Sequence, residues 1–108
     1  MSKPIWITIG SLENYEKTDS LKGLMIKFIN FCKESGYIKG AAVDLDKFME
    51  NNHIGPNQRK MFLGVLELRQ YINGNKLIHN PKVIQDNFEF RSNSVAYVIK
   101  KYLEEHAA

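Results

Sequence analysis

Residues 44–78 read DLDKFMENNHIGPNQRKMFLGVLELRQYINGNKLI, and this stretch decides the fold. It holds two amphipathic segments separated by a break at Gly55 and Pro56. The break follows from proline chemistry, because Pro56 cannot continue a helix and biases Gly55 away from helical geometry. Asn73-Gly74, between Gln-Tyr-Ile and Lys-Leu-Ile, is the strongest short-range signal for a β-hairpin. The pattern predicts a short helix, a tight turn, a longer helix and a hairpin.

Helix boundaries in this stretch follow from capping residues. Asp44 is a good N-cap, which predicts a short helix to about Asn52 with an apolar inner face of Leu45, Phe48 and Met49. Asn57 is the expected N-cap of a second helix over 58–72. This helix has two neighbouring apolar rows at helical spacing: Met61, Val65, Leu68 and Ile72 in one, and Phe62 and Leu66 in the other.

Upstream of this stretch the sequence predicts a long central helix over 20–35. Its apolar residues recur at the spacing of one helical face, and they are Leu21, Leu24, Met25, Phe28 and Cys32. Either Asp19 or Ser20 can cap this helix, and Gly36 stands where a left-handed C-terminal cap belongs. Residues 4–9 are β-branched and partly alternating, which predicts a short strand, and the polar residues 10–19 predict a loop.

Downstream, the sequence predicts one more strand and one more helix. In 82–90 the residues Ile84, Phe88 and Phe90 share one face of an extended chain, which indicates a strand with one wet side. Ser92-Asn93-Ser94 then caps a final helix over 94–105.

The whole pattern indicates one α+β domain over residues 1–108, with four helices and a small antiparallel hairpin or sheet. A chain of 108 residues that is 44% hydrophobic has the size and composition of a single globular domain. We expect its core to contain one residue set drawn from these apolar faces: Leu24, Phe28, Phe48, Phe62, Leu66, Phe88, Val98 and Tyr102.

Charge is unevenly distributed along the chain. The net charge is +3, and all of the surplus lies in residues 55–108, which also hold all three arginines. A polyanionic partner is therefore permitted, although a surplus of this size is more often simply solvated surface charge. The single cysteine, Cys32, excludes an internal disulfide. The sequence has no apolar run near the ~20 residues of a membrane span and no signal peptide, so we expect a soluble, cytoplasmic protein without a membrane partner.

Residues 44–90 resemble a winged helix-turn-helix domain, through the short helix, the break at 54–56, the second helix and the hairpin. The resemblance implies that the second helix enters the major groove of DNA and that the hairpin forms a wing on the flanking backbone. The residues in these places are Gln58, Arg59 and Lys60, which would contact base edges, and Lys76, His79 and Lys82, which would lie along the wing near phosphates. The function implied is a DNA-binding, transcriptional regulatory domain.

An alternative interpretation of the same residues assigns them no binding role: they form the solvated first turn of a helix. Arg59 and Lys60 are two consecutive cations at a helix N-terminus with no acid beside them. The helix macrodipole disfavours positive charge there. Their presence at this position therefore slightly favours the DNA-binding hypothesis.

The sequence does not indicate an enzyme. Cys32 lies on an apolar helix face, where a thiol is usually inert packing. Glu50 and His53 have the spacing of a di-metal ligand pair, but such sites use two copies and this chain has one. Asp44 and Asp46 are explained as a helix cap and a first-turn acid. We therefore expect no catalytic residues, no metal and no cofactor.

A second class of function stays open, that of a protein-binding inhibitor such as a toxin-neutralising immunity protein or an antitoxin. The polar segment 10–19 combines three acids, Glu13, Glu16 and Asp19, with one aromatic side chain, Tyr15. Such a loop would attract a basic toxin, and the tyrosine would serve as its anchor. The choice between DNA and a protein partner, and the oligomeric state, are not decided by the sequence.

Overall fold

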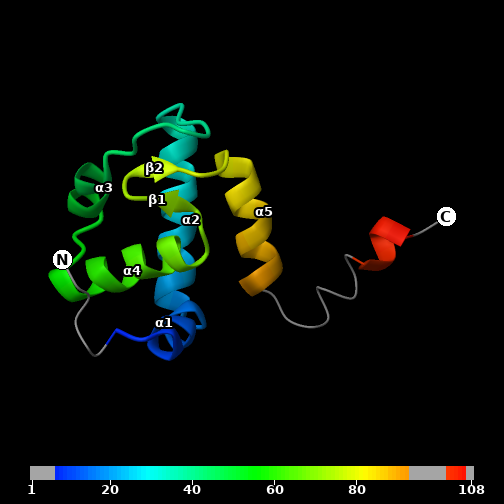
Figure 1. Ribbon diagram of the computed structural model, residues 1–108, viewed down its shortest axis with the longest axis horizontal. Helices are drawn as coiled ribbons and strands as arrows, with labels where there is room; N and C mark the ends of the chain where they lie inside the picture. Colours follow the sequence, from blue (N-terminus) through cyan, green and yellow to red (C-terminus); the bar gives the residue numbers. More distant parts are fainter. Residues whose placement is uncertain (1–6, 93–101, 107–108) are drawn as a thin grey trace.

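The computed structural model describes residues 7–92 and 102–106. Within residues 7–92 the chain forms five helices and a two-stranded hairpin (Figure 1). In chain order they are α1 (Ile9–Glu16), α2 (Asp19–Glu34), α3 (Leu45–Asn51), α4 (Pro56–Leu68), β1 (Ile72–Asn73), β2 (Lys76–Leu77) and α5 (Pro81–Ser92). Residues 102–106 add a short helical segment. The α+β class is confirmed, but the expected four helices are too few.

The first of the additional helices is α1, which replaces the expected loop over 10–19. It begins after a reciprocal cap: Thr8 Oγ1 accepts from the Ser11 N–H at 3.1 Å, and Ser11 Oγ accepts from the Thr8 N–H at 2.8 Å. This capping box satisfies two otherwise unpaired N–H groups, which compensates for the polar sequence. The expected strand over 4–9 is wrong at Ile9, which is helical, and residues 4–6 lie outside the described part of the chain.

The central helix α2 confirms the expected helix over 20–35. Its five apolar face residues are all buried. The cap is neither Asp19 nor Ser20 but Thr18, whose Oγ1 accepts from the Leu21 N–H at 3.2 Å. Gly36 has φ +74° directly after the helix, as its expected role as a left-handed cap requires.

The helix pair α3 and α4 confirms the expected short helix and longer helix. Asp44 Oδ1 accepts from the Lys47 N–H at 3.1 Å and caps α3. The expected cap of α4 is wrong: Pro56 is already helical, because its missing N–H is no loss at the first position of a helix. Helix α4 also ends at Leu68, four residues before the expected end, and Gln70 has φ +59°.

The hairpin is confirmed, with Ile72 opposite Leu77 and Asn73 opposite Lys76. The segment 40–43 pairs with the other edge of β2. Ala42 forms an antiparallel bridge with Lys76, the Val43 N–H donates to the Asn75 carbonyl at 2.7 Å, and the Leu77 N–H donates to the Ala41 carbonyl at 3.0 Å. Strand β2 therefore has backbone partners on both sides, and these partners attach the hairpin to the segment that leads into α3.

The expected strand over 82–90 is wrong, because these residues belong to α5. Proline at the first helical position is well tolerated, and the Asn80 carbonyl accepts from the Val83 and Ile84 N–H groups at 2.9 and 3.2 Å. Ile84 and Phe88 are buried, and their spacing of four fits both a helix and a strand face. Only Phe90 separates the two alternatives, and it is 48% exposed.

The core confirms six of the eight expected residues: Leu24, Phe28, Phe48, Phe62, Leu66 and Phe88 are buried. Tyr102 was expected in the core and is 59% exposed, so that expectation is wrong. Val98 and most of the expected helix over 94–105 lie outside the described residues, and Ser92 belongs to α5.

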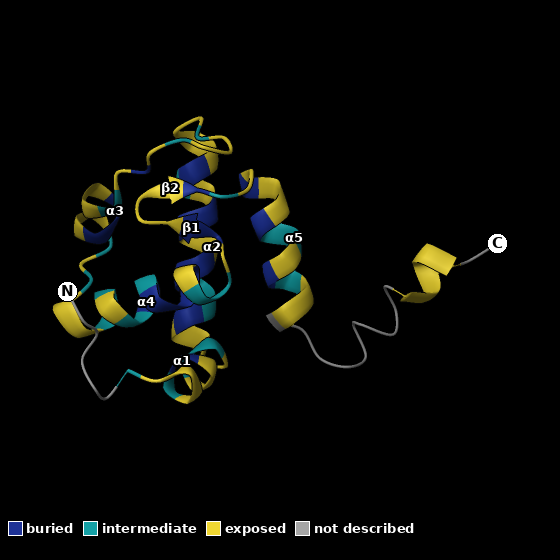
Figure 2. Cartoon of the chain, viewed as in Figure 1, coloured by how far each residue is buried: buried dark blue, intermediate teal, exposed yellow. Residues whose placement is uncertain are grey.

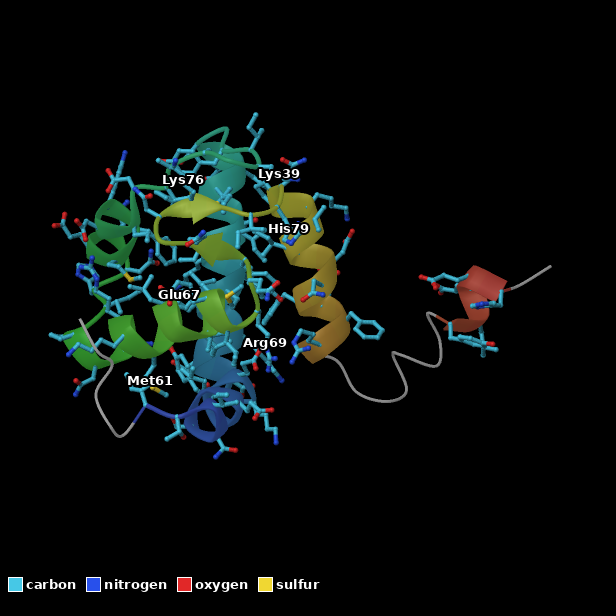
Figure 3. All side chains as sticks on the ribbon, viewed as in Figure 1. Lys39, Met61, Glu67, Arg69, Lys76 and His79 are labelled. Carbon is cyan, nitrogen blue, oxygen red and sulfur yellow. The ribbon has the colours of Figure 1, made fainter. Side chains whose placement is uncertain are left out.

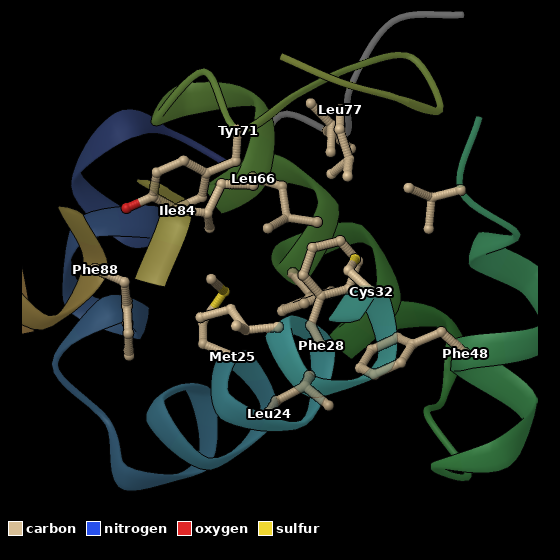
Figure 4. Packing of buried hydrophobic residues seen from close by; sticks show 14 of the residues in the cluster. Leu24, Met25, Phe28, Cys32, Phe48, Leu66, Tyr71, Leu77, Ile84 and Phe88 are labelled. Carbon is tan, nitrogen blue, oxygen red and sulfur yellow. The ribbon is translucent and has the colours of Figure 1, made fainter. Parts of the chain in front are cut away.

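Three aromatic rings connect the helices at the centre. Phe28 of α2 lies 5.3 Å from Phe48 of α3 and 5.6 Å from Phe62 of α4, measured between ring centroids. Dark blue in Figure 2 marks the buried stretches of these helices, and Figure 4 shows the side chains of Phe28 and Phe48 within the cluster. This cluster fixes the angle between α3 and α4, the two helices of the expected DNA-binding unit.

Candidate nucleic-acid interface and a charged junction

The first turn of α4 holds the three residues expected to contact base edges. Gln58 is partly buried, and its Nε2 lies 3.5 Å from Ser20 Oγ. Arg59 forms an ion pair with Asp46 of α3. Lys60 is exposed and has no ion pair within the described part of the chain. The three residues are adjacent, but they have different surroundings, and Lys60 is the most accessible of them.

The residues expected on the wing are divided between three segments. Lys76 is exposed in β2, and His79 is exposed just after it. Lys82 does not lie along the hairpin: it belongs to the first turn of α5, where its Nζ lies 3.0 Å from Asp86 Oδ1. The cause is the same as for the wrong strand, because Pro81 begins a helix there.

Lys39 is a further cation at this end of the molecule that sequence reasoning missed. Its backbone N–H donates to Asn80 Oδ1 at 2.7 Å, which holds the 37–43 segment against the start of α5. Figure 3 shows Lys39, Lys76 and His79 around β2 and the first turn of α5. Lys39 and Lys76 are brought together by backbone pairing between distant segments, and no local sequence pattern signals this.

Negative charge lies beside Arg59 and the hairpin turn. An open hollow of about 470 Å³ next to the hairpin turn is lined by Ala42, Val43, Asp44, Leu45, Asp46, Arg59 and Asn75. Asp46 forms an ion pair with Arg59, and Glu67 is exposed further along α4 (Figure 3). The hollow therefore offers acceptors as well as donors, which suits polar base edges better than a bare phosphate.

The four residues expected in an acidic loop lie on two helices, α1 and α2. Glu13 and Asp19 are exposed, but Glu16 is paired and Tyr15 is partly buried. Burial raises the pKa of Tyr15, and the Gln58 amide opposite it partly offsets this effect. The expectation of a loop is therefore wrong, because Glu13, Tyr15 and Glu16 belong to α1 and Asp19 begins α2.

The most highly organised charged group joins α1 to the end of α4. Arg69 Nε lies 3.0 Å from both Oε1 and Oε2 of Glu16, and its Nη2 also donates to Oε1. Arg91 of α5 approaches the same carboxylate, with Nε 3.9 Å from Oε2. The hydrogen bond to Glu16 raises the pKa of Arg69. Sequence reasoning missed this pair, because its members are separated by 53 positions.

The described residues contain no group of three His, Cys, Asp or Glu side chains that could hold a metal ion. Burial raises the pKa of the Cys32 thiol to about 12, so it is a poor nucleophile near neutral pH. Among the helices of residues 7–92 and 102–106, none has the length and apolar character to cross a bilayer.

Comparison of the chain with protein-family models, with curated proteins and with solved structures gave no significant match.

Proposed function

We propose that the protein is a non-enzymatic DNA-binding protein that acts as a winged-helix-like regulatory domain, with α4 as the helix that meets the major groove. The observation that carries the proposal is the backbone connection between the hairpin and the helix pair. Because β2 pairs with both β1 and the 40–43 segment, the hairpin and α3–α4 form one unit. A rigid helix pair flanked by a hairpin is an arrangement that can meet a groove and its neighbouring backbone together.

The charges of this unit support distinct roles. Lys60 is exposed at the start of α4, where a side chain can contact a base edge or the nearest phosphate. Lys76 and His79 are exposed along β2 and just after it, which suits contacts with phosphates. Gln58 and Arg59 have the chemistry of base contacts, and Lys82 extends the basic edge onto α5.

Acidic neighbours limit the expected affinity. Asp46 neutralises Arg59, and the exposed Glu67 places a negative charge on α4 itself. Acidic side chains repel the phosphates of the DNA backbone. This proposal therefore depends more on contacts that distinguish DNA sequences than on general electrostatic attraction. We therefore expect binding in the micromolar range at low salt, as for weak or non-specific complexes.

The test is a fluorescence anisotropy titration of a labelled mixed-sequence duplex with the full chain, at several salt concentrations. We expect log K to fall with log salt by about 0.9 for each phosphate contacted. Lys60→Ala and Lys76→Ala should weaken binding, and Lys76→Ala should reduce this slope by about one contact. Lys27→Ala is the matched control, since Lys27 is an exposed α2 lysine outside the expected set.

Two results would overturn the proposal. One is no binding at tens of micromolar protein and low salt, where even non-specific binders form complexes. The other is an equal loss of affinity for Lys27→Ala and Lys60→Ala. The first result would direct attention to a protein partner for the exposed acids Glu13 and Asp19. The second would mean that DNA is attracted by overall positive charge and not through α4.

A further inference from the structure

A second hollow, on a different part of the molecule, lies where α1, α2, α5 and the end of α4 meet. Its volume is about 200 Å³, and six of its seven lining residues are charged: Glu13, Glu16, Lys17, Lys22, Arg69, Arg91, with Phe88 as the seventh. The four cations outnumber the two carboxylates, which leaves a surplus of two positive charges in this small space. None of these residues belongs to the expected DNA-contacting set.

One pair within this group already satisfies itself. Both oxygens of Glu16 accept from Arg69: Oε2 from Nε and Oε1 from Nη2, in the fork geometry that is the strongest form of this ion pair. The two side chains are only 15% and 17% exposed, respectively. Glu16 and Arg69 therefore form a neutral, fixed base for the hollow.

Arg91 is held near this pair without being satisfied by it. Its Nε is 3.9 Å from Glu16 Oε2, which is beyond hydrogen-bond distance. The reason is geometric, because Arg69 already occupies that carboxylate. The Arg91 guanidinium is attracted to the hollow, while its N–H donors remain available to another acceptor.

Lys17 and Lys22 add two further cations on the same hollow. Neither has an ion pair within the described part of the chain, and Glu13 is the remaining acid near them. Cations gathered around one hollow repel each other, and the repulsion is larger beside a buried apolar wall such as Phe88. A bound anion would remove this repulsion.

We propose that this hollow binds a small, doubly charged oxyanion such as inorganic phosphate or a phosphate monoester. Arg91 presents a planar fork to two of its oxygens, and Lys17 and Lys22 act as point charges on the others. The surplus of two positive charges matches the charge of such an ion. The volume of about 200 Å³ suits a small molecule. The inference is independent of the proposed DNA binding.

The test compares thermal unfolding of the full chain in millimolar phosphate and in sodium chloride of matched ionic strength. Phosphate should raise the unfolding temperature beyond the effect of chloride. At a phosphate concentration of 100 times Kd, the folding equilibrium constant should increase by about 100-fold. Equal shifts in the two salts would overturn the proposal.

Variants give the test its specificity. Lys22→Gln should abolish the phosphate response and leave the protein without phosphate as stable as the wild type or more so, because a repelling cation has been removed. Arg91→Gln should lose the same response, and Lys27→Gln, on the exposed face of α2, should keep it. A phosphate response that survives Lys22→Gln and Arg91→Gln would overturn the proposal.

The source of the phosphate is a separate arm of the same experiment. A labelled short duplex is titrated with wild type and with Lys22→Gln. A free-anion site predicts equal duplex affinity for the two proteins. Loss of duplex affinity in Lys22→Gln without any response to free phosphate would assign these cations to the DNA backbone and overturn the small-anion site.

Discussion

The two ends of helix α4 each carry an arginine in an ion pair with another helix, and the two pairs differ in almost every respect. Arg59, in the first turn, pairs with Asp46, and their side chains are 40% and 73% exposed. Arg69, at the C-cap, pairs with Glu16, and both side chains are less than one fifth exposed. Exposed pairs contribute about 0–1 kcal/mol, whereas breaking a desolvated one is costly. The same residue type is therefore available for recognition at one end and structural at the other.

The helix macrodipole strengthens the contrast. A cation is stabilised at a helix C-terminus, where Arg69 lies, and destabilised at an N-terminus, where Arg59 lies. Asp46 offsets the unfavourable position of Arg59. The N-terminal end of α4, which is unfavourable for a cation, is also the end at which we propose that DNA binds. The phosphates of DNA are negatively charged, so their interaction with this end of the helix is favourable.

The largest effect should come from truncating Phe62, the fully buried residue of α4 that lies between its two arginines. Phe62→Ala should destabilise the protein by about 3–5 kcal/mol, because the ring is fully buried against Phe28 and Phe48. Chemical denaturation measures the change. A loss below about 0.5 kcal/mol, the range of a surface substitution, would show that α4 does not depend on this cluster.

The next effect tests the buried end. Glu16→Gln should cost about 1–3 kcal/mol, because it leaves the Arg69 guanidinium partly desolvated without a charged partner. Glu50→Gln, at an exposed position of α3 outside this charged group, is the control and should change stability by less than about 0.5 kcal/mol. Equal effects in denaturant unfolding would mean that burial does not distinguish the two carboxylates.

A pH measurement sharpens the picture of the buried end. Burial raises the pKa of Tyr71 from 10.0 to about 12; Arg91 and Arg69 oppose this rise and Glu16 adds to it. Because the pKa is raised in the folded state, this contribution to stability is complete below pH 10 and is lost as the pH rises to about 12. Cys32, raised from 9.0 to about 12, acts in the same direction.

The variant for this test is Tyr71→Phe. Its stability should fall less steeply than that of the wild type between pH 10 and about 12. It should also lose some stability at neutral pH, because the Tyr71 hydroxyl donates to Asn87 Oδ1 at 2.7 Å. Tyr102→Phe, at an exposed tyrosine, is the control. Identical alkaline slopes for Tyr71→Phe and the wild type would contradict the assignment.

The sequence predicts those parts of the fold that are determined by local signals. The rows of apolar residues predict α2 and α4, Asp44 predicts the start of α3, and Asn73-Gly74 predicts the hairpin. Helix α1 was missed because its cap uses serine at the third position, where a capping box usually has Glu or Gln. Helix α5 was missed because a spacing of four fits two periodicities at once.

The candidate sites are less predictable, because they depend on distant contacts. The Arg59–Asp46 pair joins two helices, and the Glu16–Arg69 pair joins positions separated by 53 residues. Sequence reasoning identified Gln58, Arg59 and Lys60 as one group, and it could not show that Arg59 would be neutralised by Asp46. Lys39 and the charged hollow depend on the tertiary fold in the same way.

The smallest effect on stability, and the sharpest on recognition, should come from the exposed end. Asp46→Asn should change stability by less than about 1 kcal/mol, because the pair is exposed and screened by salt. If Arg59 contacts DNA, the variant should bind a duplex up to about fivefold more tightly, since an exposed pair is worth at most about 1 kcal/mol. Anisotropy titration at fixed salt measures the gain.

Glu50→Gln removes the same charge from an exposed position of α3 and controls for net charge. The double variant Asp46→Asn, Arg59→Ala completes the comparison: it should bind like Arg59→Ala alone, because Asp46 acts through that guanidinium. A gain in affinity that persists without Arg59 would contradict this prediction, because it would mean that Asp46 does not act through that guanidinium.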